Sequence, residues 1–410
     1  MMSVQEAKKK VREVLFCLPR VRLPLEKALF RVLAQDIRAP ICLPLYDNSA
    51  MDGFALRSED TGSASSEHPL SLKIMGTQKA GDPPTLKIKS GELVRIMTGA
   101  TIPKGADAVV MKERVEEKEG KIFISTPVLR GNNIRKRGEE IQKGSLILPA
   151  GTFLNSRSLG LLANLGLKKI PVRKTPKVSL IITGSELVSA SQKRRHGQIY
   201  DSNSPLLLAA LREIHLKASF VKRVKDDEEK LKRILEEAFQ KTEVVLVVGG
   251  VSVGDYDFSK QVFRRLGVKT IFWSVAQKPG KPLFFGKKGR RLLFGLPGNP
   301  VSAWVCFHEY VIPALLGLQG SFEFSSKPFQ AILEKAVKPD FTKTLFLRGN
   351  FQSHNGQAKV EAFTGQGSHM LKSLAEANCL IQIPPQKDFL TPGSRVEARG
   401  FVSLRAGGYR

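Results

Sequence analysis

The chain has 410 residues, which is too long for one ordinary domain, so we expect two to four compact units. Apolar residues make up 42% of the chain and include 23 phenylalanines among the aromatics, which excludes wholesale disorder. Lys and Arg number 65 against 38 Asp and Glu, a net charge of +27. The excess is spread in short clusters without any DNA-reading motif, so it predicts a basic surface suited to small anions and no specific nucleic-acid partner.

The pattern of apolar segments and cysteines favours a cytoplasmic protein. Residues 1 to 10 contain Glu6 and three lysines but no apolar core of signal-peptide length. The longest apolar stretch, residues 301 to 318, carries His308 and Glu309, so we expect a buried helix and no membrane span. The cysteines have no CxxC spacing, which fits a reducing compartment, and they are Cys17, Cys42, Cys306 and Cys379.

The N-terminal part is predicted to contain a β-rich unit. Residues 41 to 143 show short strands, many Gly and Pro turns, and no alternation of helices with strands. The flanking segments, 19 to 40 and 144 to 172, are expected to form one small linking module into which the β-rich unit is inserted. Residues 1 to 18 are expected to pack on the domain that follows.

The central third, residues 173 to 322, alternates strands with helices. Strands are predicted at 177 to 182, 218 to 224, 243 to 248, 269 to 273 and 291 to 294. Helices are predicted at 205 to 214, 227 to 239, 258 to 266 and from 301 onward. This order implies right-handed crossovers and a doubly wound, mostly parallel sheet. Residues 323 to 410 are again short-stranded and predict a C-terminal β-barrel, so the fold class is α/β with β-rich accessory domains.

Three strand-end turns are the strongest candidates for a binding site. Thr183-Gly184, Gly249-Gly250 and residues 298 to 300 each follow a predicted strand, and ligands of doubly wound sheets lie at the carboxyl ends of the strands. We therefore expect all three turns to share one edge.

The second of these turns continues into a polar loop. Gly249, Gly250 and Gly254 would let backbone N–H groups approach an oxyanion, and Ser252 can donate a hydrogen bond to it. Asp255 and Asp257 would repel a phosphate unless Mg²⁺ lay between them. The alternative is a plain strand-to-helix turn with acidic capping.

Two further loops and two acidic positions add to the predicted site. Lys278 and Lys281 can converge on one anion, although a solvated basic turn has the same composition. Residues 296 to 302 open the long helix and include the hydroxyl of Ser302, and a capped helix without ligand is the alternative. Glu186 could orient a ligand or approach a metal. Asp226-Asp227 opens a helix, where acidic residues usually just complement the helix dipole.

Other polar segments cannot be assigned from physical chemistry alone. In the β-rich unit, residues 47 to 55, 95 to 100 and 133 to 140 could each be an Asx-turn or a surface loop. The six histidines show no metal-ligand spacing, so we interpret them as structural or surface residues.

Taken together, five segments resemble the molybdopterin molybdenumtransferases, the family that includes the C-terminal domain of gephyrin. The matching segments, in the family's order, are 47 to 55, 97 to 100, 249 to 257, 278 to 282 and 295 to 302. The resemblance covers essentially the whole chain. It implies four domains and a homodimer whose active site joins the pterin-binding domain of one subunit to the β-rich unit of the other. Glu140 departs from the family, which more often has Asp there.

The resemblance also implies an activity and a set of residue roles. The activity is insertion of molybdate into adenylated molybdopterin with Mg²⁺-dependent release of AMP, the last step of molybdenum cofactor biosynthesis. Residues implied to come from the partner subunit are Asp52 and Thr98, with Arg135 as a further binding residue. Those implied to serve the adenylated pterin and its Mg²⁺ are Glu186, Asp227 and Asp257. Those implied to hold molybdate are Lys278, Lys281, Ser302, Arg348 and Ser368.

Three other functions stay open at this point. The chain could be a scaffold that keeps the fold but binds partner proteins, or a polyanion-binding protein, as the net charge suggests. It could also be the related pterin adenylyltransferase, which would not need the flanking β-rich units. Transient contact with the adenylyltransferase and with molybdoenzymes is a further expectation. The sequence does not discriminate molybdate from tungstate.

Overall fold

The computed structural model describes residues 1 to 250, 258 to 321 and 328 to 401. The chain divides into two compact units. The first contains Met1–Gln35, Ala150–Leu159 and Lys169–Arg410, and the second contains Asp36–Pro149 and Gly160–Lys168. The predicted linking module thus has segments in both units, and the predicted four-domain boundaries remain a prediction.

The first unit is built around a six-stranded sheet with strand order β16-β13-β17-β21-β20-β18. Its strands are β13 (Val178–Thr183), β16 (Ala218–Val224), β17 (Val244–Val248), β18 (Lys269–Trp273), β20 (Phe284–Lys288) and β21 (Arg291–Leu296). The first four in this order are parallel. The doubly wound, mostly parallel sheet is therefore confirmed. Strand β20 was not predicted, and it makes the edge of the sheet antiparallel by pairing with both β21 and β18.

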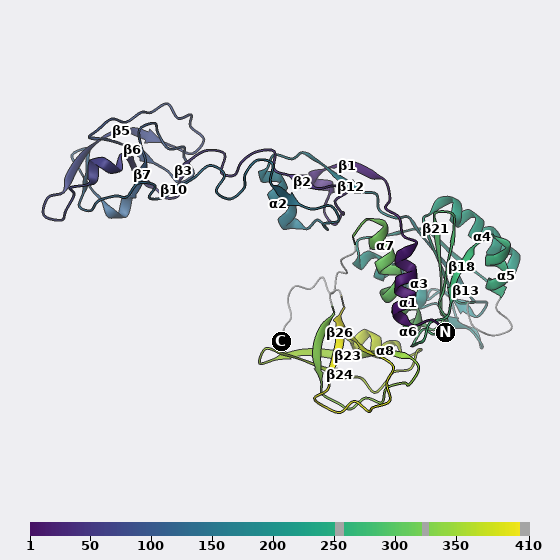
Figure 1. Cartoon of the computed structure of the whole chain (residues 1–410). Helices are drawn as coiled ribbons and strands as arrows, with labels where there is room; N and C mark the ends of the chain where they lie inside the picture. The colour runs from purple at the N-terminus through teal and green to yellow at the C-terminus, as the bar shows by residue number, and fades with distance from the viewer. Residues whose placement is uncertain (251–257, 322–327, 402–410) are drawn as a thin grey trace. The chain divides into compact units, whose positions relative to one another are not determined.

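Helices cover both faces of this sheet (Figure 1). Alternate residues of β17 face opposite sides: Leu246 packs in one apolar cluster and Val247 in the other. Such strands read as continuous apolar runs because both faces are buried. The helices on the Leu246 side are α1 (Val4–Glu13), α3 (Asn203–Glu213), α6 (Pro300–Cys306) and α7 (Ile312–Leu318). Those on the Val247 side are α4 (Glu228–Lys241) and α5 (Phe258–Arg265).

The longest apolar helical segment lies in the core of the first unit. A π-helical turn, η4 (Phe307–Val311), joins α6 to α7, so Pro300–Leu318 is one continuous helical segment. It has the length and apolar composition of a membrane span, but 94% of an 18-residue window within it is buried inside the protein. Burial of this kind is typical of a core helix, as predicted from the sequence.

Helix α1 packs against α7 and η4. The side chain of Ser3 accepts a hydrogen bond from the backbone N–H of Glu6, and the Glu6 carboxylate accepts one from the backbone N–H of Ser3. This reciprocal capping box fixes the start of the helix. Further along, Lys8 forms an ion pair with the fully buried carboxylate of Glu309 in η4.

The C-terminal strands close into a barrel, as predicted. The order β23-β24-β22-β26-β25 is closed by pairing of β25 with β23. The strands are β22 (Phe329–Leu333), β23 (Thr344–His354), β24 (Gln357–Ala362), β25 (Cys379–Ile383) and β26 (Arg395–Gly400), and α8 (Leu371–Glu376) precedes β25. Strand β19 (Gln277–Lys278) pairs with β23 at one edge, so the chain between β18 and β20 reaches the barrel.

The second unit is β-rich, and its main sheet has the order β7-β4-β6-β5-β9-β8. These strands are β4 (Gly53–Leu56), β5 (Leu70–Gln78), β6 (Glu92–Ile96), β7 (Ala108–Met111), β8 (Glu116–Lys118) and β9 (Lys121–Ile124). Two short pairs accompany it, β3 (Asn48–Ser49) with β10 (Ile134–Arg135) and β2 (Ile37–Arg38) with β11 (Leu146–Leu148). In the first unit, β1 (Arg20–Pro24) pairs with β12 (Lys169–Arg173), and α2 (Ser156–Asn164) has residues in both units.

Candidate functional site

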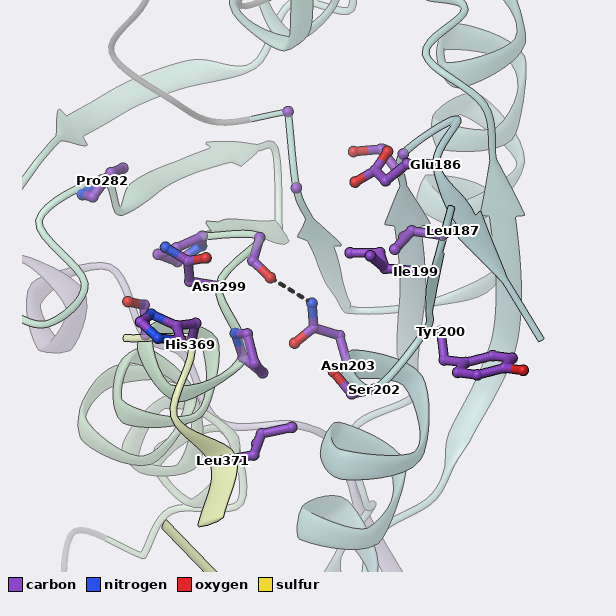
Figure 2. Close-up of a pocket in the computed structure, with 18 of the residues that line it drawn as sticks. Glu186, Leu187, Ile199, Tyr200, Ser202, Asn203, Pro282, Asn299, His369 and Leu371 are labelled. Carbon is purple, nitrogen blue, oxygen red and sulfur yellow. Dashed lines mark hydrogen bonds between the residues drawn. The ribbon is translucent and has the colours of Figure 1, made fainter. Parts of the chain in front are cut away.

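A cavity of about 690 Å³ lies at the carboxyl ends of the parallel strands. Thr183-Gly184 after β13, Gly249-Gly250 after β17 and residues 297 to 300 after β21 all line it. The prediction that these three turns share one edge is therefore confirmed. Figure 2 shows further side chains around the cavity, including those of Glu186, Asn203, Asn299 and His369.

The segments after β13 and β16 place two carboxylates at the cavity. Glu186 and Asp226 both line it. The carboxylate of Asp226 accepts a hydrogen bond from the backbone N–H of Ser185 at 3.0 Å, and the Ser185 hydroxyl accepts one from the Asp226 N–H, also at 3.0 Å. These reciprocal bonds tie the segment after β13 to the segment after β16. The two acidic side chains are thus presented by neighbouring parallel strands.

Asp227, which was predicted to serve the metal, has a structural role in this unit. Its carboxylate caps α4 by accepting from the backbone N–H of Lys230 at 2.9 Å. This bond, with a further bond from the Lys230 side chain, lowers the pKa of Asp227. Asp227 is not among the residues that line the cavity, whereas its neighbour Asp226 is. A role of Asp227 in metal binding stays a prediction.

The turn after β17 requires glycine. Gly249 and Gly250 have φ values of +87° and +61°. A Cβ on Gly249 would lie 2.6 Å from the carbonyl oxygen and 2.8 Å from the hydroxyl oxygen of Thr183, which is closer than real contacts allow. The remainder of this motif, with Ser252, Gly254 and Asp257, lies outside the described residues. Within the described ranges, no group of three or more His, Cys, Asp or Glu residues has metal-binding geometry.

The turn after β21 and the start of α6 are held by three long-range hydrogen bonds. The side-chain N–H of Asn203, at the start of α3, donates to the carbonyl oxygen of Gly298 at 2.7 Å (Figure 2). The side-chain N–H of Asn299 donates to the hydroxyl of Ser368 at 3.0 Å. In addition, the backbone N–H of Val301 donates to the Ser368 carbonyl at 3.1 Å. Ser368 therefore lies beside the first turn of α6, which also carries the buried side chain of Ser302.

Arg348, on β23, is buried, and its guanidinium contacts the segment that leads to Ser368. Its Nη2 donates to the carbonyl oxygens of Gly365 at 2.8 Å and Gly367 at 3.1 Å, and its Nε donates to the hydroxyl of Ser373 at 2.9 Å. Among the described residues, its buried Nη1 has no hydrogen-bond partner. Burial lowers the pKa of Arg348. The guanidinium thus holds the backbone next to Ser368, and its Nη1 amino group has no hydrogen-bond partner among the described residues.

The loop of Lys278 and Lys281 lies against α6. Both lysine side chains are exposed. A Cβ added to Gly280 would lie 3.4 Å from the carbonyl oxygen of Ser302, so the loop backbone runs close to the start of α6. Pro282 lines the main cavity, while Lys278 lines a second cavity of about 340 Å³ beside the barrel. The loop therefore adjoins the predicted oxyanion site, although neither lysine is among the residues that line the main cavity.

In the second unit, the three polar segments that could not be assigned lie together. Asn48 in β3 pairs with Arg135 in β10. The carboxylate of Asp52 accepts from the backbone N–H of Thr98 at 2.7 Å and from its hydroxyl at 2.9 Å. These bonds lower the pKa of Asp52. The predicted residues Asp52, Thr98 and Arg135 therefore belong to one polar region of this unit.

Sequence reasoning missed two cavity residues of interest. Asn203 belongs to none of the predicted site segments, but it is 6% exposed and its Oδ1 has no partner among the described residues. His369 was interpreted, like the other histidines, as a structural or surface residue, but it lines the cavity. No local signal identified either residue, because each reaches the cavity through contacts between segments far apart in the chain.

In chain order, the structure has a β-rich unit, a doubly wound sheet with a strand-end cavity, and a β-barrel. Family models agree in that order. Residues 2–166 match the MoeA N-terminal region (domain I and II), 179–317 a probable molybdopterin binding domain, and 330–400 the MoeA C-terminal region (domain IV).

Relatives and solved structures extend over nearly the whole chain. A molybdopterin molybdenumtransferase of Haemophilus influenzae is 36% identical over 98% of this chain and 100% of the relative. One of Synechococcus elongatus is 38% identical over 92% of this chain and 94% of the relative. The crystal structure of the molybdopterin biosynthesis MoeA protein from Pyrococcus horikoshii has a TM-score of 0.84 and 31% identity, covering 98% of this chain and 100% of that one.

The chain belongs to the molybdopterin molybdenumtransferase family. It is a transferase of molybdenum cofactor biosynthesis.

Proposed function

We propose that the chain inserts molybdate into adenylated molybdopterin and releases AMP in an Mg²⁺-dependent reaction. The observation that carries this proposal is the cavity in which three strand-end turns meet, with Ser302 at one wall and the carboxylates of Glu186 and Asp226 at another. A cavity of this volume suits a substrate with a pterin, a phosphate and a nucleotide. The backbone at Gly250 can approach its phosphates closely because glycine has no side chain, and the hydroxyl of Ser302 is a further donor at the cavity.

The molybdate end of the site is assigned to the wall formed by α6, the lysine loop and the barrel. Molybdate is a tetrahedral dianion, which cationic groups and hydroxyl donors stabilise. Lys278 and Lys281 supply exposed ammonium groups. Ser302 and Ser368 lie on adjoining backbone segments. The Nη1 of Arg348, which has no partner among the described residues, is a further donor beside the segment that leads to Ser368.

The acidic residues fit a magnesium ion. Mg²⁺ prefers oxygen ligands and is usually bound by one or two carboxylates together with substrate phosphates. Glu186 and Asp226 present such oxygens at the cavity, and Asp257 is the predicted third carboxylate. When bound, the ion supplies charge neutralisation during cleavage of the phosphoanhydride bond that releases AMP. The protein residues bind the two substrates side by side, and the dithiolene sulfurs of the pterin become the ligands of molybdenum.

The remaining parts of the proposal concern assembly and place of action. We propose a homodimer in which Asp52, Thr98 and Arg135 of one subunit complete the site of the other. The polar region that these residues form in the second unit supports this assignment. We also propose a cytoplasmic location and transient contacts with the pterin adenylyltransferase and with molybdoenzymes.

The test is molybdate-dependent release of AMP. Purified protein, adenylated molybdopterin, Mg²⁺ and molybdate should yield AMP and a molybdenum-loaded pterin. Lys281→Ala should raise the KM for molybdate about tenfold, because it removes one charge-assisted contact. Lys269→Ala, at an exposed lysine of β18, is the matched control and should leave it unchanged. AMP release by the wild type that does not depend on molybdate would contradict the proposal. A wild type without any activity would favour the scaffold alternative.

A further inference from the structure

We propose that Gln277 and Tyr310 are positioning residues that hold the Lys278–Lys281 loop against α6 and thereby set the affinity for molybdate. This inference rests on the proposed function, in which the loop contributes to the oxyanion site. Neither residue has a side chain at the cavity. They act through the backbone of the loop, whose two lysines are exposed while its turn is buried.

The side chain of Gln277 is fully buried directly beneath the loop. Its Nε2 donates to the carbonyl oxygens of Pro279 and Gly280, each at 3.2 Å. Its Oε1 accepts a hydrogen bond from the hydroxyl of Tyr310. One carboxamide therefore holds two consecutive carbonyls of the loop and is itself held by the core helix. In a buried site each of these bonds matters, because an unpaired polar group is costly there.

The loop also packs tightly against α6. Gly280 has a φ of +87°, which glycine adopts without strain. A Cβ at this position would lie 2.6 Å from Sγ of Cys306 and 2.8 Å from Nε2 of Gln277. The Cys306 thiol also lies 3.5 Å from the Gly280 carbonyl oxygen. The turn between the two lysines thus rests directly on α6, the helix that carries Ser302.

Both ends of the loop are anchored as well. On one side, β19 pairs with the first residues of β23, the strand that carries Arg348, and the N–H of Thr344 donates to the carbonyl of Ala276 at 3.0 Å. On the other side, the N–H of Val275 donates to the carbonyl of Lys281 at 3.0 Å. The backbone that carries the two lysines is therefore fixed relative to Ser302 and Arg348, the other proposed molybdate residues.

Tyr310 reaches Gln277 from the π-helical turn η4. Such turns interrupt an otherwise regular helix and are frequent near functional sites. Tyr310 is 1% exposed, and burial raises the pKa of its hydroxyl, which therefore stays protonated and available as a donor. The hydroxyl has a defined acceptor in Gln277, so Tyr310→Phe removes one hydrogen bond and leaves the ring packing intact.

The expected consequence is a selective loss of molybdate affinity. Without the Tyr310 bond, the carboxamide can rotate, and the loop samples positions in which the ammonium groups do not converge on the oxyanion. Molybdate binding must then order the loop again, and this entropic cost weakens the affinity for molybdate. Tyr310→Phe should raise the KM for molybdate about fivefold, as expected for one buried hydrogen bond, while kcat and the KM for adenylated molybdopterin stay near wild type. Gln277→Leu should have a larger effect in the same direction.

The test combines kinetics, molybdate binding by titration calorimetry, and thermal unfolding. The matched control is Thr242→Val, which removes a fully buried hydroxyl that bonds Ser179 and the Ala238 carbonyl on the far side of the sheet. This control should lower the melting temperature without changing the KM for molybdate. A purely structural role of Tyr310 would give the same result for both variants and would overturn the inference.

A double-mutant cycle separates the remaining outcomes. If the two residues act through one network, Tyr310→Phe should have little further effect on molybdate binding in the Gln277→Leu background. Full additivity would contradict the network, as would an unchanged molybdate dissociation constant in Tyr310→Phe. A wild type that shows no molybdate-dependent AMP release would instead overturn the proposed function itself.

Discussion

At the residue scale, the Asp52–Thr98 contact gives a prediction about protonation. The backbone N–H of Thr98, followed by its hydroxyl, holds the pKa of Asp52 below its ordinary value. Thr98→Ala removes only the hydroxyl bond, so the pKa of Asp52 should rise part of the way back. Because the folded-state pKa is lowered, this contact favours the folded state above the unfolded pKa of about 3.9 and ceases to do so as the pH falls through the folded-state pKa. An NMR titration of the Asp52 carboxyl measures the shift.

Thr101→Ala is the control for this titration, since Thr101 lies in the same loop and bridges to Asn48 rather than to Asp52. An unchanged pKa of Asp52 in Thr98→Ala would show that the Thr98 hydroxyl does not contribute to lowering that pKa.

Residue roles were predictable from the sequence only where local pattern and position agree. Gly249 and Gly250 follow a buried β-branched run, and this predicted a turn at the ligand edge, as observed. Asp226 and Asp227 are adjacent in sequence, and nothing in their pattern indicates which one faces the cavity and which one caps α4. Tyr310 and Gln277 are 33 residues apart, and their hydrogen bond depends on a π-helical turn that has no sequence signature.

At the element scale, α1 is fixed by a buried ion pair. Burial by itself would raise the pKa of Glu309, but Lys8, His308 and Arg399 outweigh it and hold that pKa below its ordinary value. Lys8→Met removes the partner from α1 while keeping the apolar stem. It should lower the free energy of unfolding by about 3 kcal/mol, the low end for breaking a buried pair, because the other cations remain. Urea unfolding, with hydrogen exchange of the α1 amides, measures this loss.

Lys9→Met is the matched control, because Lys9 is an exposed neighbour in the same helix. It should change stability by less than about 0.5 kcal/mol. The pH dependence has a definite sign: the Glu309 contribution is present above the unfolded pKa of about 4.3 and is lost as the pH falls through the lowered folded-state value. Equal stability of the two lysine variants would show that the ion pair does not anchor α1.

Elements of the central sheet were well predicted, and the exception has a physical cause. Runs such as Val244–Val248 are rich in β-branched residues and are buried on both faces. Their continuous apolar sequence is therefore easy to distinguish from the alternating apolar and polar pattern of the amphipathic helices between them. Strand β20 (Phe284–Lys288) reverses into β21 after only two residues. Its glycine and two lysines resemble a loop in sequence, and its pairing with β18 is not a helical crossover, so the alternation rule did not predict it.

At the scale of the whole molecule, the proposed shared active site predicts complementation between inactive variants. If Asp52 and Glu186 serve the same site from different subunits, a 1:1 mixture of Asp52→Asn and Glu186→Gln dissociated and reassembled together should recover about a quarter of wild-type activity. Half of the dimers would be mixed, and one of the two sites in each mixed dimer would be intact. The measurement is molybdate-dependent AMP release after reassembly.

The matched control is a mixture of Glu186→Gln with Ser302→Ala, because both residues line the same cavity of one subunit. Every site in that mixture carries one defect, so no activity should return. Recovery in neither mixture, with mixed dimers verified by mass spectrometry, would contradict a site shared between subunits.

The widened turn at Phe307–Val311 has a consequence for how this core helix can vary among relatives. Each residue of an α-helix advances the chain by about 100° around the axis. A π-helical turn holds about one residue more than an α-helical turn for the same sweep around the axis. Deleting one residue within the turn would therefore restore regular winding while α6 and α7 keep their angular relation. The side chains of the turn itself would be displaced, so Tyr310 would no longer be directed at Gln277. Homologous chains that lack this residue should keep the α6 and α7 surfaces and lose the hydrogen bond to Gln277.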